Sequence, residues 1–220
     1  MLVVAHRAGN EVGALRRALD AGADLIEADV RYFRGVPEIR HRKTLGPRLL
    51  WDHPWELVRR SRTAVPTLDD VLAALDGDPR LMLDLKGNDP RLAPAVARRL
   101  RHAAPTAPIA VCTRNWRMLD AFAGNTAVRT VISAGSQREF TRLRAVLRTK
   151  PDRWPGRRQA FGVSVRRTLL TSGLVAELHR AVDHVLAWPV DTREQLADAV
   201  RLGVSGVTGK DVALLAAAVP

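Results

Sequence analysis

Short apolar, β-branched segments alternate with amphipathic segments along the whole chain, and this alternation restricts its fold more than any other feature. The sequence predicts strands at residues 2–7, 24–31, 81–87, 108–114, 128–134, 160–165, 184–190 and 203–209. It predicts helices at residues 11–22, 66–77, 90–103, 115–123, 138–148, 172–182, 192–202 and 211–218. Strands that alternate with helices favour a parallel sheet covered by helices.

Eight strand–helix units in 220 residues match the size of a compact (β/α)8 TIM barrel. A doubly wound open sheet remains the alternative, because alternation alone does not show that a sheet closes. No linker or composition break is visible, so we expect one domain over residues 1–220. Residues 42–65 are the only long stretch without strong periodicity, and we expect this stretch over the catalytic face of the barrel, functional or partly structured.

The amino-acid composition limits the class of protein to which this chain can belong. The chain is 46% hydrophobic and 26% charged, as in water-soluble globular proteins. Cys112 is the only cysteine, which excludes an intrachain disulfide. Neither a signal-peptide pattern nor an apolar segment long enough to cross a bilayer is visible. We therefore expect a cytoplasmic protein.

The net charge is +12, and most of the basic residues are arginines. They are spread along the chain and do not interleave with aromatic residues as stacking platforms for nucleic acid do. We therefore expect no specific nucleic-acid partner, but a surface that attracts anions and allows peripheral contact with an anionic membrane. A non-catalytic barrel that binds anionic surfaces or polyanions through its arginine excess is the rival hypothesis.

Side chains two residues apart on a strand point the same way, and this places several charged groups on the inner face. On the second predicted strand, Glu27 and Asp29 lie opposite the apolar face. On the third, Asp84 and Lys86 do so, and on the first, His6 does. If the strands close into a barrel, these five side chains converge at one mouth.

Three carboxylates that are partly removed from water repel one another unless a cation lies between them. Oxygen ligands suit a hard divalent cation, either Mg²⁺ or Ca²⁺. Lys86 could then neutralise an anionic substrate group such as a phosphate. The alternative is that Glu27 and Asp29 are an ordinary solvated pair or take part in a salt bridge.

His41 closes the segment "PEIRH" shortly after the second strand. A single histidine in such a place is more often structural or exposed than catalytic. Together with His6 across a metal site, His41 would complete a general acid and a general base.

Several motifs resemble those of the glycerophosphodiester phosphodiesterase family, in order and approximate spacing, over nearly the whole chain. They are "AHRAGN", "GADLIEADV" with the following His41, "VPTLDDVL", "LDLKG" and "LAWPVDTREQLADAVRLGVSGVTG". The resemblance implies a TIM barrel that cleaves glycerophosphodiesters, or related lysophospholipid-type diesters, to an alcohol and a glycerol phosphate or cyclic phosphate. A lyase or isomerase on the same barrel is a further alternative.

The resemblance also implies a role for each site residue. His6 and His41 would be the acid and base, and Glu27, Asp29 and Asp84 would bind a divalent cation. Arg7 and Lys86 would contact the phosphate. Trp188 would line the substrate pocket, with ordinary core packing as its alternative.

The sequence departs from the family pattern at three places. The loop after Arg7 is short, and only Asn10 stands in a comparable position. Asp84 replaces the usual glutamate, and its "DLK" context resembles sphingomyelinase D-type phospholipases. His41 is followed by "RKTLGP" rather than by an aspartate. Because these loops shape the pocket, we expect the departures to affect the substrate head group.

Overall fold

The computed structural model describes residues 1–52, 56–103, 105–149 and 160–216. Within them, eight parallel strands form a closed barrel, because β1 pairs with both β12 and β2. This closure confirms the predicted (β/α)8 fold and excludes the open doubly wound sheet. The barrel strands are β1 (Leu2–Ala5), β2 (Leu25–Phe33), β7 (Leu81–Leu85), β8 (Ile109–Thr113), β9 (Val128–Ala134), β10 (Ala160–Arg166), β11 (His184–Trp188) and β12 (Gly206–Gly209).

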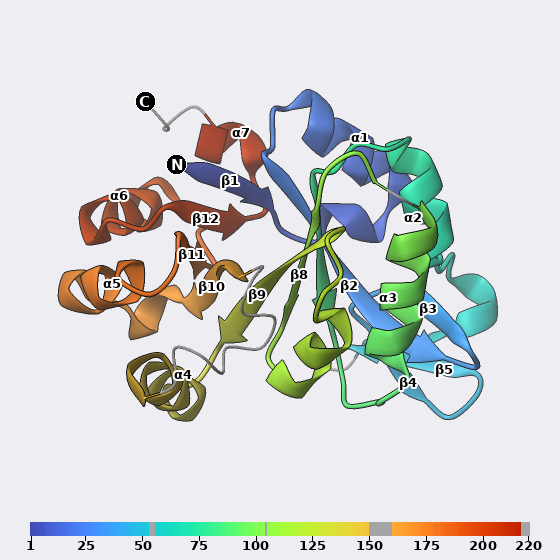
Figure 1. The fold of residues 1–220 in the computed structure, drawn as a ribbon. Helices are drawn as coiled ribbons and strands as arrows, with labels where there is room; N and C mark the ends of the chain where they lie inside the picture. Colours follow the sequence, from blue (N-terminus) through green and yellow to red (C-terminus); the bar gives the residue numbers. More distant parts are fainter. Residues whose placement is uncertain (53–55, 104, 150–159, 217–220) are drawn as a thin grey trace.

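Helices surround the barrel (Figure 1). They are α1 (Val12–Asp20), α2 (Leu68–Leu75), α3 (Leu92–Ala103), α4 (Gln137–Thr149), α5 (Ser172–His179), α6 (Arg193–Leu202) and α7 (Val212–Ala216). Residues 217 and 218 of the last predicted helix lie outside the described residues. No helix in the described ranges is long and apolar enough to cross a membrane.

The helix predicted at 115–123 differs from the expectation. It is the 3-10 helix η3 (Trp116–Phe122), not an α-helix. Trp116, Leu119 and Phe122 are three residues apart and all buried. A 3-10 helix has three residues per turn, so this spacing aligns the three side chains on one face toward the core.

The period-two pattern of the strands divides the core into two layers. Outward-facing residues such as Ile26 and Leu83 pack against the helices. Inward-facing residues such as Val4, Met82 and Leu186 fill the barrel. Polar residues at inward positions of the same strands therefore project into the barrel, at its carboxyl end.

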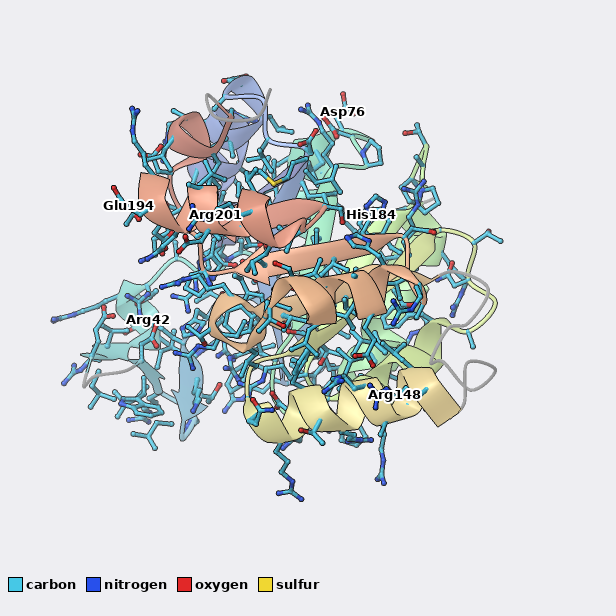
Figure 2. All side chains as sticks on the ribbon, turned by 90° about the vertical axis from the view of Figure 1, so that its left-hand side faces the viewer. Arg42, Asp76, Arg148, His184, Glu194 and Arg201 are labelled. Atoms are coloured by element: carbon cyan, nitrogen blue, oxygen red, sulfur yellow. The ribbon has the colours of Figure 1, made fainter. Side chains whose placement is uncertain are left out.

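The chain between β2 and α2 forms additional strands, of which the sequence pattern indicated only a short extended piece at residues 37–41. Strand β3 (Val36–Ile39) runs antiparallel to β2. A small antiparallel sheet follows, built from β4 (Lys43–Leu45), β5 (Leu49–Asp52) and β6 (Glu56–Arg59), and it ends in η2 (Arg60–Arg62). Figure 2 shows Arg42, beside this small sheet, and His184, at the start of β11, on opposite sides of the molecule. The small sheet thus lies toward the carboxyl ends of the barrel strands.

Candidate active site

A cavity of about 270 Å³ opens at the carboxyl ends of the barrel strands. It brings together seven of the eight side chains that the sequence singled out, while the eighth, Asp29, is fully buried beside them. The seven that line the cavity are His6, Arg7, Glu27, His41, Asp84, Lys86 and Trp188.

The chain makes a sharp turn where β1 delivers its last residues to the cavity. Arg7 has a φ of 58°, in the left-handed region that few non-glycine residues adopt. Its backbone N–H donates to Glu27 Oε2 at 2.6 Å. The turn leads into η1 (Ala8–Asn10), which packs closely on β2: a Cβ on Gly9 would lie 2.7 Å from Ala28 Cβ. Strain of this kind persists where the surrounding contacts enforce it, often at functional sites.

Glu27, Asp29 and Asp84 form one carboxylate cluster. Asp29 of β2 lies in register with Asp84 of β7, and ligand oxygens of all three residues lie within 4.8 Å of one another. Burial raises the pKa of Glu27 well above its usual range, and the charge of Asp29 raises it further. Burial also raises the pKa of Asp84. The site thus disfavours three negative charges unless positive charge compensates them.

Lys86, just after β7, supplies part of that compensation. Its Nζ lies 2.9 Å from Asp29 Oδ1 and donates a hydrogen bond to Asp84 Oδ2. Burial alone would lower the pKa of Lys86, but the carboxylates of Asp84, Asp29 and Glu27 raise it, so the ammonium stays charged.

Asn10 holds Asp29 in place. Its Nδ2 donates to Asp29 Oδ2 at 2.8 Å, and its Oδ1 accepts the backbone N–H of Asp29 at 2.7 Å. Burial alone would raise the pKa of Asp29, but Lys86 and the hydrogen bond from Asn10 hold it below its usual value. The sequence indicated Asn10 only as the one residue left in a shortened loop, without a role.

The donor set fits a hard divalent cation. Three carboxylates converge, and they face the Lys86 ammonium and the Arg7 guanidinium, whose Nε lies 3.5 Å from Asp29 Oδ2, so one negative charge remains in excess when all three are ionised. Burial is the main cause of the raised pKa of Glu27, and the positive charge of Lys86 offsets it only in part. Carboxylate oxygens in this arrangement are the ligands that Mg²⁺ and Ca²⁺ prefer.

His6 directly precedes Arg7 in the chain. Its backbone N–H donates a 2.8 Å hydrogen bond to Gly209 O. Burial, aided by the positive charges of Arg7 and Lys86, lowers the pKa of His6 to about 4. Its Nδ1 is buried and has no hydrogen-bond partner in the described part of the chain. At neutral pH His6 is therefore an uncharged imidazole facing the cavity.

His41 has a carboxylate partner that the sequence did not predict. Its Nδ1 lies 2.8 Å from Asp52 Oδ2, and its backbone carbonyl accepts a 2.9 Å hydrogen bond from Arg31 Nε. A carboxylate on one ring nitrogen fixes the tautomer and leaves Nε2 for other chemistry. Asp52 ends β5 in the aperiodic stretch 42–65, so no pattern in the sequence related it to His41.

Two further large side chains, Trp188 and Arg114, line the cavity. Trp188, at the end of β11, is half-buried, and its Nε1 has no hydrogen-bond partner within the described ranges. Arg114, just after β8, also lines the cavity and pairs in a bidentate manner with Glu139, at 3.0 and 2.9 Å. No pattern in the sequence assigned Arg114 a role.

Solved structures with this fold include several named as phosphodiesterases. A phosphodiesterase from Oleispira antarctica in complex with the product sn-glycerol-3-phosphate is 17% identical, with a TM-score of 0.75 over 99% of this chain and 96% of its own. A glycerophosphodiester phosphodiesterase from Thermotoga maritima is 16% identical, with a TM-score of 0.73 over 99% and 97%. One from Parabacteroides distasonis is 18% identical, with a TM-score of 0.68 over 95% and 92%.

No protein-family model and no curated protein sequence matches this chain. The likeness therefore lies in the three-dimensional structure: nearly the whole chain has the barrel fold of solved glycerophosphodiester phosphodiesterases.

Proposed function

We propose that residues 1–220 form one catalytic barrel, a metal-dependent phosphodiesterase that cleaves glycerophosphodiesters or lysophospholipid-type phosphodiesters. One observation carries this proposal: two histidines, three carboxylates and a lysine meet around a single cavity. The shared barrel supports it, and one structure with that barrel holds sn-glycerol-3-phosphate, a phosphate monoester that a diesterase of this kind would release.

The charged residues suit a phosphodiester anion. A divalent cation, Mg²⁺ or Ca²⁺, bound by Glu27, Asp29 and Asp84 would act as a Lewis acid toward a phosphate oxygen. Lys86 and Arg7, which line the same cavity, stabilise the negative charge that grows on the phosphate oxygens in the transition state.

The two histidines differ in a way that suggests their roles. His6 is neutral at pH 7 and accepts a proton from the attacking hydroxyl. His41, held by Asp52 at Nδ1, would enter the step as the imidazolium, which this carboxylate stabilises, and donate its Nε2 proton to the departing alcohol. The attacking hydroxyl belongs to water or to the substrate itself, and the product is then a glycerol phosphate or a cyclic phosphate.

The proposal is tested by incubating the purified protein with glycerophosphocholine and following the products by ³¹P NMR, which separates a glycerol phosphate from a cyclic phosphate. We expect turnover with Mg²⁺ or Ca²⁺ and its loss with a chelator. The cation should also raise the melting temperature, since a ligand at a hundredfold excess over its Kd stabilises a protein by about 2.7 kcal/mol. The double variant Glu27→Gln/Asp84→Asn should lose both effects.

His6→Ala should abolish turnover, whereas His102→Ala is the matched control, because His102 is exposed near the end of α3. Turnover that persists in His6→Ala, or in the presence of chelator, would contradict the mechanism. No turnover, together with salt-sensitive binding to polyanions that Glu27→Gln leaves unchanged, would favour the non-catalytic alternative.

A further inference from the structure

The small sheet β4–β6 has two faces of opposite character. Cross-strand partners share a face, so the register gives one row of Lys43, Trp51 and Leu57, and a second row of Leu45, Leu49 and Arg59. We call the surface formed by these six residues the outer face. The other face contains Leu50, which is fully buried, and Asp52, which contacts His41. The sheet thus rests on the barrel through one face and presents the other to solvent.

The outer face is apolar where a solvent-facing sheet surface is usually polar. The exposed fractions of Leu45 and Leu57 are 55% and 52%, two of the three most exposed large apolar side chains in the described part of the molecule. Trp51 and Leu49 lie between them, half-buried. An apolar surface of this kind indicates a binding surface for something other than water.

The charges on this face are all positive. Lys43 Nζ lies 4.8 Å from the centroid of the Trp51 ring, and Arg59 has no carboxylate partner among the described residues. Two more exposed arginines, Arg48 and Arg62, flank the sheet. Glu56 of β6 belongs to the opposite face and is paired with Arg42 at 2.5 Å. A partner must therefore present both apolar and anionic groups.

The face is small, because it consists of three strands of three or four residues, and a stable protein interface would have to extend well beyond it. A bilayer needs no such area, because a few leucines and a tryptophan enter the head-group region while cations meet anionic lipids.

We propose that the outer face docks this protein onto anionic lipid bilayers. The inner face of the same sheet supplies Asp52 to His41, so a protein docked in this way has its catalytic cavity beside the membrane. If the proposed function holds, on which this step rests, the membrane itself supplies the diester, and lysophospholipid-type substrates are favoured over free glycerophosphodiesters.

The test is co-sedimentation of the protein with vesicles of phosphatidylcholine alone or mixed with phosphatidylglycerol. We expect binding to the mixed vesicles that weakens as salt rises. Leu45→Ser/Leu57→Ser and Lys43→Glu/Arg59→Glu should each weaken it at least about tenfold. The control Val200→Ser/Arg180→Glu changes one exposed apolar and one exposed basic residue on α6 and after α5, away from the small sheet, and should bind like wild type.

Absence of binding to the mixed vesicles, or equal binding by all variants, would overturn the proposal. So would a dimer in solution that Leu45→Ser/Leu57→Ser abolishes, since the occupant of the face would then be a second copy of the chain. Turnover of glycerophosphocholine, which forms no bilayer, should be unchanged in the outer-face variants. A wild type that binds vesicles but turns over no diester would refute the proposed function and leave the docking surface standing.

Discussion

The imidazole of His41 has a carboxylate partner, whereas the Nδ1 of His6 has none within the described residues. This difference makes the proposed roles of the two histidines separable by experiment. A p-nitrophenyl leaving group departs without a proton, so it needs no general acid. A variant that lacks only the proton donor is then rescued by that substrate, and a variant that lacks the proton acceptor is not.

We therefore predict that His41→Ala loses about a hundredfold or more in kcat on glycerophosphocholine and far less on a p-nitrophenyl diester. His6→Ala should lose activity on both substrates. Asp52→Asn should resemble His41→Ala with a smaller loss of about tenfold, because Asp52 positions the ring and does not itself transfer the proton. The measurement is kcat for each variant on both substrates.

Glu56→Gln is the matched control for Asp52→Asn, since both residues lie on the inner face of the small sheet and only Asp52 touches a histidine. An equal loss for Asp52→Asn on the two substrates would mean that Asp52 has only a structural role. Rescue of His6→Ala instead of His41→Ala would reverse the assignment of acid and base.

At the scale of single residues, the local sequence pattern predicts the positions of some site residues and not of others. The alternation of the strand "LIEADV" was sufficient to place Glu27 and Asp29 on the inner face. No such rule relates Asn10 to Asp29 or Asp52 to His41, because these hydrogen bonds join residues 19 and 11 positions apart that lie on different segments of the fold. Such contacts depend on how the loops pack, which a single sequence does not show.

At the scale of the elements, one largely buried ion-pair network, centred on Glu38, holds the small sheet in place. Glu38 of β3 accepts hydrogen bonds from Arg40 Nε at 2.8 Å and Arg60 Nη1 at 2.9 Å. Arg60 directly follows β6, so this network joins the end of the small sheet to the barrel. Burial alone would raise the pKa of Glu38, but the hydrogen bonds from both arginines lower it below its ordinary value.

We predict that Glu38→Gln lowers the free energy of unfolding by about 3 kcal/mol at pH 7, because two arginines lose their buried partner. Since the pKa of Glu38 is lower in the folded state, the stability that it supplies is present above its unfolded pKa of about 4.5. This stability is lost as the pH falls through the folded pKa. Urea unfolding should show the two proteins converging in stability as the pH falls below the unfolded pKa of Glu38. A constant difference across this range would contradict the network.

The elements differ in how clearly the sequence predicts them. Each barrel strand is a short apolar run flanked by a helix pattern, and all eight were predicted within a few residues of their ends. The strands of the small sheet were not predicted. Their segments "KTL", "LLWD" and "ELVR" contain both leucines and charged residues and show no alternation between an apolar and a polar face. The property that concealed these strands is the one on which the proposed membrane surface depends.

At the scale of the whole molecule, the fold requires that the eight strands close into a barrel. The sequence indicated this closure only through the number of predicted strands. Closure occurs where β12 pairs with β1, with Gly209 opposite Ala5, and on its other side Gly209 closely approaches the backbone just after β11. A Cβ on Gly209 would lie 1.9 Å from Val190 O. The carbonyl of the same glycine accepts the backbone N–H of His6. Gly209 thus links barrel closure to the position of a proposed catalytic group.

We predict that Gly209→Ala destabilises the protein by about 1–3 kcal/mol, because the backbone must shift to admit the methyl group. The shift displaces His6, so diester turnover should fall even at temperatures where the variant is fully folded. Gly173→Ala is the matched control: it lies in α5 with no atom within 4 Å of the added Cβ, and alanine there should gain about 0.5–1 kcal/mol. The measurements are urea unfolding and diester turnover of both variants. Wild-type stability and activity in Gly209→Ala would show that the barrel closes without the close approach of β12 to Val190.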